Sequence, residues 1–136
     1  MPALRNYHIF ISHSWDYNEQ YETVREWLDD ANNFSSCNYS VPLSHPIDAK
    51  TKKELKEKIR AKISPCSCII VLSGMYVDYS EWIDFEMDIA QEYGKPIIGV
   101  KPWGQQRVPA KVQEMADVMV GWNSSSIVQA VREYAL

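Results

Sequence analysis

The sequence predicts a three-layer α/β fold of the flavodoxin-like type, a five-stranded parallel sheet with helices on both faces. The runs Cys68–Leu72 and Ile97–Val100 are continuously apolar and rich in β-branched residues, as strands covered on both faces are. Segments with helical spacing alternate with such runs about five times along the chain. A chain of 136 residues is long enough for one core, so we expect a single domain over residues 1–136.

The element boundaries follow from local signals. Residues 32–38 are typical of a turn, because Asn and Ser cluster there. Ser80 is the expected N-cap and Gly94 the expected C-cap of the third long helix, and Asn123 or Ser124 should cap the last one. The expected strands are 7–12, 39–43, 68–72, 97–100 and 116–120, in the order 2-1-3-4-5, and the other helices are 18–31, about 51–63, 110–115 and 125–136.

Composition excludes several classes of function. The chain is 46% hydrophobic and 24% charged, with a net charge of −4, which is ordinary for a globular protein. Lys and Arg are scattered outside one helix, so we expect no nucleic-acid partner. No apolar run approaches the ~18 residues of a membrane span, and the N-terminus lacks a signal-peptide layout. We therefore expect a cytoplasmic protein with no membrane partner.

The basic helix and the cysteines have plain structural interpretations. Residues 50–62 carry seven Lys and Arg side chains with Glu54 and Glu57 between them, a pattern typical of a solvated helix face. Cys37, Cys66 and Cys68 are odd in number and lack metal-ligand spacing, which favours buried thiols. We expect no metal site.

Glu86 is the anomaly of this sequence. At about 100° per residue, Trp82, Phe85 and Ile89 fall on one apolar stripe of a helix, and Asp88 falls on the opposite side. Glu86 projects from the middle of the apolar stripe. A carboxylate there is costly unless it is paired or used. It is therefore either a site residue or a structural acid in an ion pair.

The expected strand order also places a site. In such folds ligands bind beyond the carboxyl ends of the strands where the order reverses, here between the first and third strands. A phosphoacceptor receiver domain needs acidic residues after the first strand, where this chain has Ser12, His13 and Ser14. Trp15 and Asp16 make the same loop a poor phosphate loop for FMN. Common nucleotide and hydrolase motifs are absent.

Two stretches of the sequence, one of them around Glu86, resemble the sequence pattern of a known family. The run from Phe10 to Ser14 (FISHS) and the later pattern Ser73, Tyr76, Ser80, Trp82 and Glu86 resemble Toll/interleukin-receptor (TIR) domains. The usual pattern is S-x-x-Y-x-x-S-x-W-C-x-x-E. Here the gap from Tyr76 to Ser80 is one residue longer, and Ile replaces the Cys. The chain is most similar to short bacterial TIR-like proteins, among them the TIR subunits of Thoeris antiphage systems.

The resemblance implies an enzyme that cleaves the nicotinamide–ribose bond of NAD, with Glu86 as the catalytic residue. Nicotinamide leaves NAD as a neutral molecule, so one carboxylate that stabilises oxocarbenium charge suffices and no general acid is needed. NAD is then a substrate, and no resident cofactor is expected. The product is ADP-ribose or a cyclic ADP-ribose-type signal for a separate effector protein. The alternative is a non-catalytic TIR interaction module that acts by self-association. The resemblance implies self-association for an enzyme of this family as well.

The resemblance also implies substrate-binding residues, each with a plainer alternative. Phe10 is also expected as strand core, Trp82 as cover for the sheet, and His13 as a solvated loop residue. The side chains expected to stack on the bases are Phe10, Trp15, Tyr76 and Trp82, and those expected to bond ribose or phosphate are Ser12, His13, Ser14 and Asp48.

Overall fold

The computed structural model describes residues 6–12, 18–31, 34–38, 52–72, 76–101 and 110–135. Strands and helices alternate within these residues. In chain order they are β1 (Asn6–Ser12), α1 (Asn18–Asp30), β2 (Ser35–Asn38), α2 (Lys52–Ile63), β3 (Cys68–Leu72), α3 (Tyr76–Glu92), β4 (Ile97–Val100), α4 (Ala110–Met115), β5 (Val118–Val120) and α5 (Ser124–Tyr134). None of the described helices is long and apolar enough to cross a membrane.

The strands form one parallel sheet in the order β2-β1-β3-β4-β5. Phe10 of β1 lies opposite Ile69 of β3, and Ile69 lies opposite Ile97 of β4. The order reverses between β1 and β3, because the chain first moves outward to β2 and then returns across β1. The predicted α/β fold with a parallel sheet is confirmed, and the observed order is the expected one.

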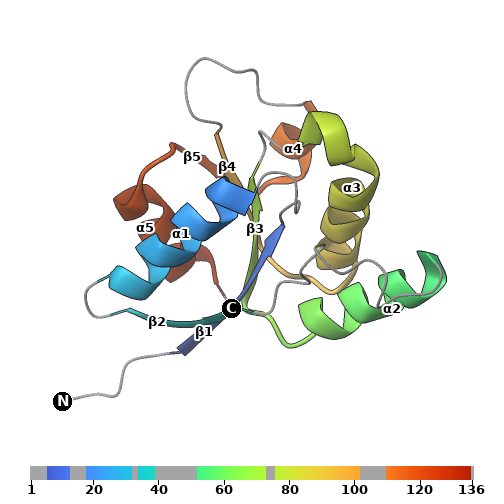
Figure 1. Cartoon of the computed structure of the whole chain (residues 1–136), viewed down its shortest axis with the longest axis horizontal. Helices are drawn as coiled ribbons and strands as arrows, with labels where there is room; N and C mark the ends of the chain where they lie inside the picture. Colours follow the sequence, from blue (N-terminus) through green and yellow to red (C-terminus); the bar gives the residue numbers. More distant parts are fainter. Residues whose placement is uncertain are drawn as a thin grey trace.

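Helices cover both faces of this sheet (Figure 1). α1 and α5 lie on one face, where they contact each other, and α2 and α3 lie on the other. α4 belongs to the second layer, since Lys111 of α4 pairs with Asp84 and Asp88 of α3. A sheet between two helix layers needs central strands that are apolar on both sides, as β3 and β4 are.

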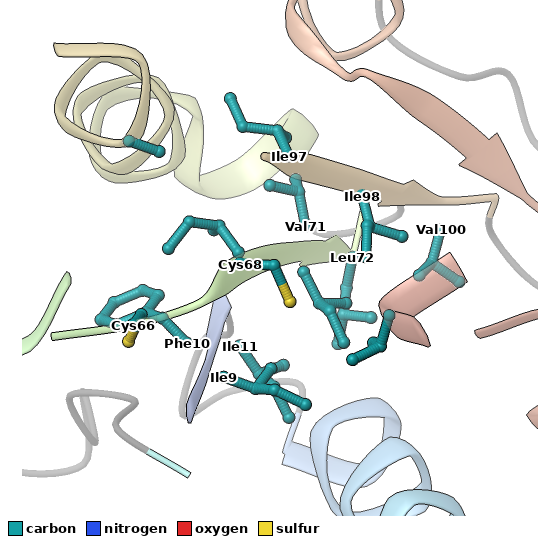
Figure 2. Close-up of a cluster of buried hydrophobic side chains, with 14 of the residues drawn as sticks. Ile9, Phe10, Ile11, Cys66, Cys68, Val71, Leu72, Ile97, Ile98 and Val100 are labelled. Atoms are coloured by element: carbon teal, nitrogen blue, oxygen red, sulfur yellow. The ribbon is translucent and has the colours of Figure 1, made fainter. Parts of the chain in front are cut away.

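The core is centred on β1, β3 and β4 (Figure 2). Every residue of β3 and β4 is buried, as their uninterrupted apolar sequences predict. Ile9 and Ile11 point toward α1, whereas Phe10 points to the opposite side of β1. Each fully buried aliphatic or aromatic side chain contributes roughly 1.5–3 kcal/mol. These three strands therefore form the stable frame from which the helices and loops of a site extend.

Two predicted helix caps are confirmed. The side chain of Asn123 accepts a hydrogen bond of 2.8 Å from the backbone N–H of Ser126, which makes Asn123 the N-cap of α5. After α3 the chain turns at Gly94, whose φ is 68°, a left-handed value that glycine adopts without strain. The backbone N–H of Lys95 then bonds the carbonyl of Ala90 at 2.8 Å, closing a Schellman motif.

The second strand was predicted wrongly. The prediction placed a turn at 32–38 and a strand at 39–43, but β2 occupies Ser35–Asn38, and residues 39–43 lie outside the described part of the chain. β2 is an edge strand that pairs with β1, so main-chain pairing defines it more than side-chain propensity does. Phe34, directly before it, is buried and stacks on Tyr7 with ring centroids 5.1 Å apart. That anchor fixes where β2 begins.

The third long helix begins earlier than predicted. α3 starts at Tyr76, so Ser80 lies inside the helix and is not its N-cap. Neither Pro nor Gly occurs between residues 76 and 92, so nothing in the chain prevents the helix from extending back by one turn. The other observed boundaries differ from the predicted ones by at most two residues.

Candidate active site

Glu86 lies on the inner face of α3 and is only 3% exposed. Its helix neighbours Met87 and Ala90 are both 0% exposed. Among the residues that the structure describes, Glu86 is the one charged side chain in the buried class. It interacts with another group of the protein, as a buried carboxylate must to offset its desolvation. The predicted inward orientation of Glu86 is confirmed.

The other carboxylates of α3 are in a different environment. Asp84 and Asp88 face α4, where the ammonium of Lys111 lies 3.6 Å from Asp84 Oδ1 and 3.7 Å from Asp88 Oδ1. The side chain of Asp88 is 57% exposed. The exposed Asp88 is accounted for by ion pairing at the surface, where a pair contributes about 0.2–1 kcal/mol, and the half-buried Asp84 shares the same cation. Among the carboxylates of α3 whose side chains the structure describes, Glu86 is the buried one that needs another explanation.

Phe85, next to Glu86, ties α3 to α2. The ammonium of Lys56 lies 5.1 Å from the centre of the Phe85 ring, and the guanidinium of Arg60 lies 5.7 Å from it. Both distances are within the range of cation–π attraction, which contributes roughly 0.5–1 kcal/mol at exposed sites. The contacts join α2 to α3 at the residue next to Glu86.

The topology places Glu86 in the layer beside the switch point of the sheet. Ser12, the last residue of β1, lies opposite Val71 of β3. α3 follows β3 and packs against it. Glu86 is about 15 Å along α3 from Tyr76, at 1.5 Å per residue. The carboxylate therefore lies on the buried side of α3, nearly three turns after the start of the helix.

The structure describes only some of the predicted binding residues. Phe10 is 1% exposed and belongs to the hydrophobic core, which is its plainer interpretation. Ser12 ends β1, and Tyr76 and Trp82 lie in α3, but the side chains of these three are outside the described part. His13, Ser14, Trp15 and Asp48 lie wholly outside it.

The larger described cavities lie away from Glu86. One of about 370 Å³ opens between α1 and α5 and is lined by residues such as Trp27, Asp30 and Arg132. Another of about 400 Å³ lies near the start of β4, beside Lys95 and Asp117. Sequence patterns did not identify these residues, because cavity-lining side chains on two helices share no spacing signal.

The thiols and potential metal ligands offer no competing chemistry in the described part of the chain. Cys66 and Cys68 are buried thiols, as predicted. Burial raises the pKa of the Cys66 thiol to about 12, against the opposing charges of Lys95 and Lys62. The thiol donates to the carbonyl of Lys62 at 3.0 Å, so it is neutral and not a nucleophile. No group of three or more His, Cys, Asp or Glu side chains in these segments is placed to hold a metal ion.

The order of the sheet defines a flavodoxin-like α/β domain, and Glu86 is the buried carboxylate among the described side chains of α3. Residues 10–107 match the family described as the TIR-like domain of the Thoeris protein ThsB, and the chain belongs to this family. Membership supports a TIR-type role in Thoeris antiphage defence, which implies partner proteins.

Solved structures show the same fold at low sequence identity. The chain is similar to the CMP N-glycosidase BcmB of Clostridium botulinum, with a TM-score of 0.57 and 13% identity, over 92% of this chain and 98% of that one. It is also similar to a 3-dehydroquinate dehydratase-like protein from Bifidobacterium longum, with a TM-score of 0.50 and 8% identity, over 95% and 94%. At such identities the likeness shows the fold alone. No curated protein matches the sequence.

Proposed function

We propose that this protein cleaves NAD between nicotinamide and ribose, with Glu86 as the catalytic carboxylate. The observation that carries the proposal is the 3% exposure of Glu86 among fully buried apolar neighbours on α3. A carboxylate removed from water interacts more strongly with developing positive charge than one at the surface. That is the property a single acid needs if it is to stabilise an oxocarbenium-like ribose.

The chemistry needs only one acid. The C–N bond to nicotinamide breaks, its electron pair leaves with the pyridine ring, and nicotinamide departs neutral. The ribose carbon gains positive charge, which the Glu86 carboxylate stabilises electrostatically. Water then attacks that carbon to give ADP-ribose, or a nitrogen of the adenine attacks it to give a cyclic product. We propose the cyclic product, acting as a diffusible signal on a separate effector protein.

The burial of Glu86 sets a condition on this mechanism. Because Glu86 is only 3% exposed, a ribose can contact its carboxylate only after the side chains around it rearrange. Catalytic contacts are often incomplete before substrate binds. The predicted binding residues Ser12, His13, Ser14, Trp15, Asp48, Tyr76 and Trp82 remain proposals for the groups that receive NAD.

The structural neighbour BcmB is consistent with this reaction class. Its name describes an N-glycosidase that acts on CMP, and nicotinamide release from NAD also breaks an N-glycosidic bond. Family membership in the Thoeris TIR-like domains supports a role in antiphage defence. The choice of NAD as substrate rests on the TIR resemblance and on the leaving-group chemistry.

The test measures nicotinamide release from NAD by concentrated purified protein, with products identified by mass spectrometry. Glu86→Gln keeps the size of the side chain and removes its charge, and should lower the rate at least ~100-fold, as for loss of one electrostatic stabiliser. Glu92→Gln is the matched control, because Glu92 is exposed on the same helix. It should leave the rate unchanged.

Two results would reject the proposal. One is wild-type protein that releases no nicotinamide even when concentrated. The other is a Glu86→Gln variant that is as active as wild type. If the variant also keeps its defence function, the chain acts as a non-catalytic interaction module.

A further inference from the structure

A cavity of about 370 Å³ opens between α1 and α5. The two helices contact each other and cover the same face of the sheet, as Figure 1 shows. The volume of the cavity is within the range of about 300–1,000 Å³ that is usual for small-molecule sites. Glu86 belongs to α3, which covers the other face of the sheet. The cavity is therefore separate from the candidate active site, and the proposed reaction does not use it.

The apolar part of the cavity lining suits a flat ring. It consists of Trp27 and Ala31 of α1 and Val128 of α5. Val128 is buried, and Trp27 is half-buried. The Trp27 ring packs on Trp122, with ring centroids 5.0 Å apart and an angle of 57° between the ring planes. Trp27 is thus held in place as an aromatic surface, on which a nucleobase stacks favourably because every base has a π-face.

The polar part of the lining carries one charge of each sign. Asp30 of α1 and Arg132 of α5 both line the cavity, and both are exposed. The guanidinium of Arg132 lies 5.6 Å from the centre of the Phe34 ring. Because Phe34 follows Asp30 by four positions, both charges lie near the C-terminal end of α1. A carboxylate accepts hydrogen bonds and a guanidinium donates them, so this end of the cavity offers both kinds of partner.

The two charged side chains differ in how they are held. Arg132 lies over Phe34, which itself stacks on Tyr7 at 5.1 Å, and a side chain that is ordered before binding loses less entropy when a ligand binds. Asp30 makes no ion pair or side-chain hydrogen bond with another described residue. Its carboxylate also lies in the last turn of α1, which has no basic residue, at the negative end of the helix dipole. A ligand that donates hydrogen bonds to Asp30 would offset that cost.

Among the nucleobases, guanine matches this set of groups best. Its N1–H and N2–H groups are adjacent and can donate to both oxygens of one carboxylate. Its O6 and N7 atoms accept hydrogen bonds from a guanidinium, which is the commonest specific contact of arginine with a base. Adenine presents a single amine to a carboxylate, and the pyrimidines have a smaller ring to stack on Trp27. The carboxylate, the guanidinium and the aromatic surface of one cavity therefore favour guanine.

We propose that the cavity between α1 and α5 binds the base of a guanine nucleotide, with the ring on Trp27 and its polar edge on Asp30 and Arg132. NAD contains no guanine, so this ligand is neither the substrate nor the product of the proposed reaction. The test involves neither NAD nor Glu86. The site therefore stands or falls independently of the proposed function.

The first measurement is calorimetric titration of the whole chain with GMP, AMP, CMP and ribose 5-phosphate, each in the same buffer. GMP should bind at least ~10-fold more tightly than AMP or CMP, because a base edge that is read through paired hydrogen bonds discriminates by about that factor or more. Ribose 5-phosphate should not bind, because it lacks the base. The proposal is overturned if GMP does not bind, or if AMP or ribose 5-phosphate binds as tightly as GMP.

The second measurement removes one partner of the base at a time. Asp30→Asn and Arg132→Gln should each weaken GMP binding at least ~10-fold, and Asp30→Asn should also narrow the preference for GMP over AMP. The matched controls are Asp29→Asn and Arg25→Gln, because both residues are exposed on α1 and neither lines the cavity. They should bind GMP as wild type does. Circular dichroism checks that each variant is folded.

Trp27→Phe tests the stacking surface separately from the charges. It keeps a ring of smaller area, so it should weaken GMP and AMP binding by the same factor and leave the preference for GMP unchanged. A folded Asp30→Asn variant with wild-type affinity and preference overturns the proposal. So does a control variant that loses binding as completely as Asp30→Asn, because the effect would then reflect net charge alone. A chain that is dimeric in sedimentation and binds no GMP would also overturn it, since a second copy would then cover the cavity.

Discussion

The two faces of α3 carry the same chemical group in opposite environments. On the outer face, Asp84 and Asp88 share Lys111 at 3.6 and 3.7 Å; Asp88 is exposed, and Asp84 is half-buried. On the inner face, Glu86 lies 3% exposed among buried apolar residues. The outer acids stabilise a contact between helices. The inner acid bears a desolvation penalty that a surface ion pair does not, and this difference is the physical ground for assigning it a chemical role.

The largest effect should come from removing the inner charge altogether. Glu86→Leu should abolish nicotinamide release, which a loss of 10²–10³-fold or more would show. Its thermal unfolding midpoint should fall below that of wild type, because the group that Glu86 contacts is left without its partner. Calorimetry and the release assay on the same sample separate the two effects. If the Glu86→Leu variant does not fold, the role of Glu86 is structural.

A second large effect should come from the apolar part of the inner face. Met87 is 0% exposed, so Met87→Ala should lower the free energy of unfolding by about 2–5 kcal/mol, measured by urea titration. Activity per folded molecule should stay near wild type, since no charge changes. Gln91→Ala, exposed on the same helix, is the control and should change stability by less than about 0.5 kcal/mol. A Met87 effect as small as the control would mean that α3 packs loosely.

Cys66 is a second buried ionisable group, and it tests how burial alone changes a pKa and the dependence of stability on pH. Its pKa is about 12 in the folded chain and 9.0 in the unfolded one, because burial disfavours the thiolate. Below pH 9 both states hold the proton, so stability is unaffected. Between pH 9 and about 12 the unfolded chain releases a proton that the native chain keeps, so stability falls as pH rises, by at most about 1.4 kcal/mol per pH unit.

The measurement for Cys66 is the difference between wild type and Cys66→Ala in urea titrations from pH 8 to about 11. The variant should be less stable at pH 8 and should lose less stability as pH rises. Parallel curves for the two proteins would contradict the inference that the thiol remains protonated in the fold.

The smallest effect belongs to the outer face. Asp88→Asn leaves Lys111 with Asp84 as its partner, so the cost should be below about 1 kcal/mol and should vanish at high salt. Thermal unfolding at two salt concentrations measures it. If Asp88→Asn lowers the free energy of unfolding by well above about 1 kcal/mol, the ion pair contributes more than an exposed pair should.

The sequence predicts the parts of this molecule that are determined by burial. β3 and β4 are covered on both sides, so their apolar runs are continuous and their positions agree with prediction. The inward carboxylate is visible for the same reason, as a polar residue in an apolar stripe. β2 could not be located in this way, because an edge strand is defined by its partner strand, and Ser35–Asn38 has no apolar pattern of its own.

The roles of side chains at the candidate site were harder to predict from the sequence than the positions of the helices and strands. Phe10 satisfies both a stacking role and a core role by residue type, and its 1% exposure assigns it to the core. The N-cap predicted at Ser80 failed because a capping residue also occurs inside helices, where its spacing looks the same. The proposal of NAD as substrate came from the TIR resemblance, because spacing and burial cannot define a substrate.

The position of β3 in the middle of the sheet has a consequence for synthesis of the chain. Its register partner on β1, Ile9 for Cys68, lies nearly sixty positions earlier, as the bond between His8 and Ser67 also shows. Until β3 has left the ribosome, the chain can form only the β1–β2 pair, and two strands are marginal in water. Closing so long a loop slows folding. A fragment that ends before Cys68 should remain unfolded, so the N-terminal half should not fold independently of the rest of the chain.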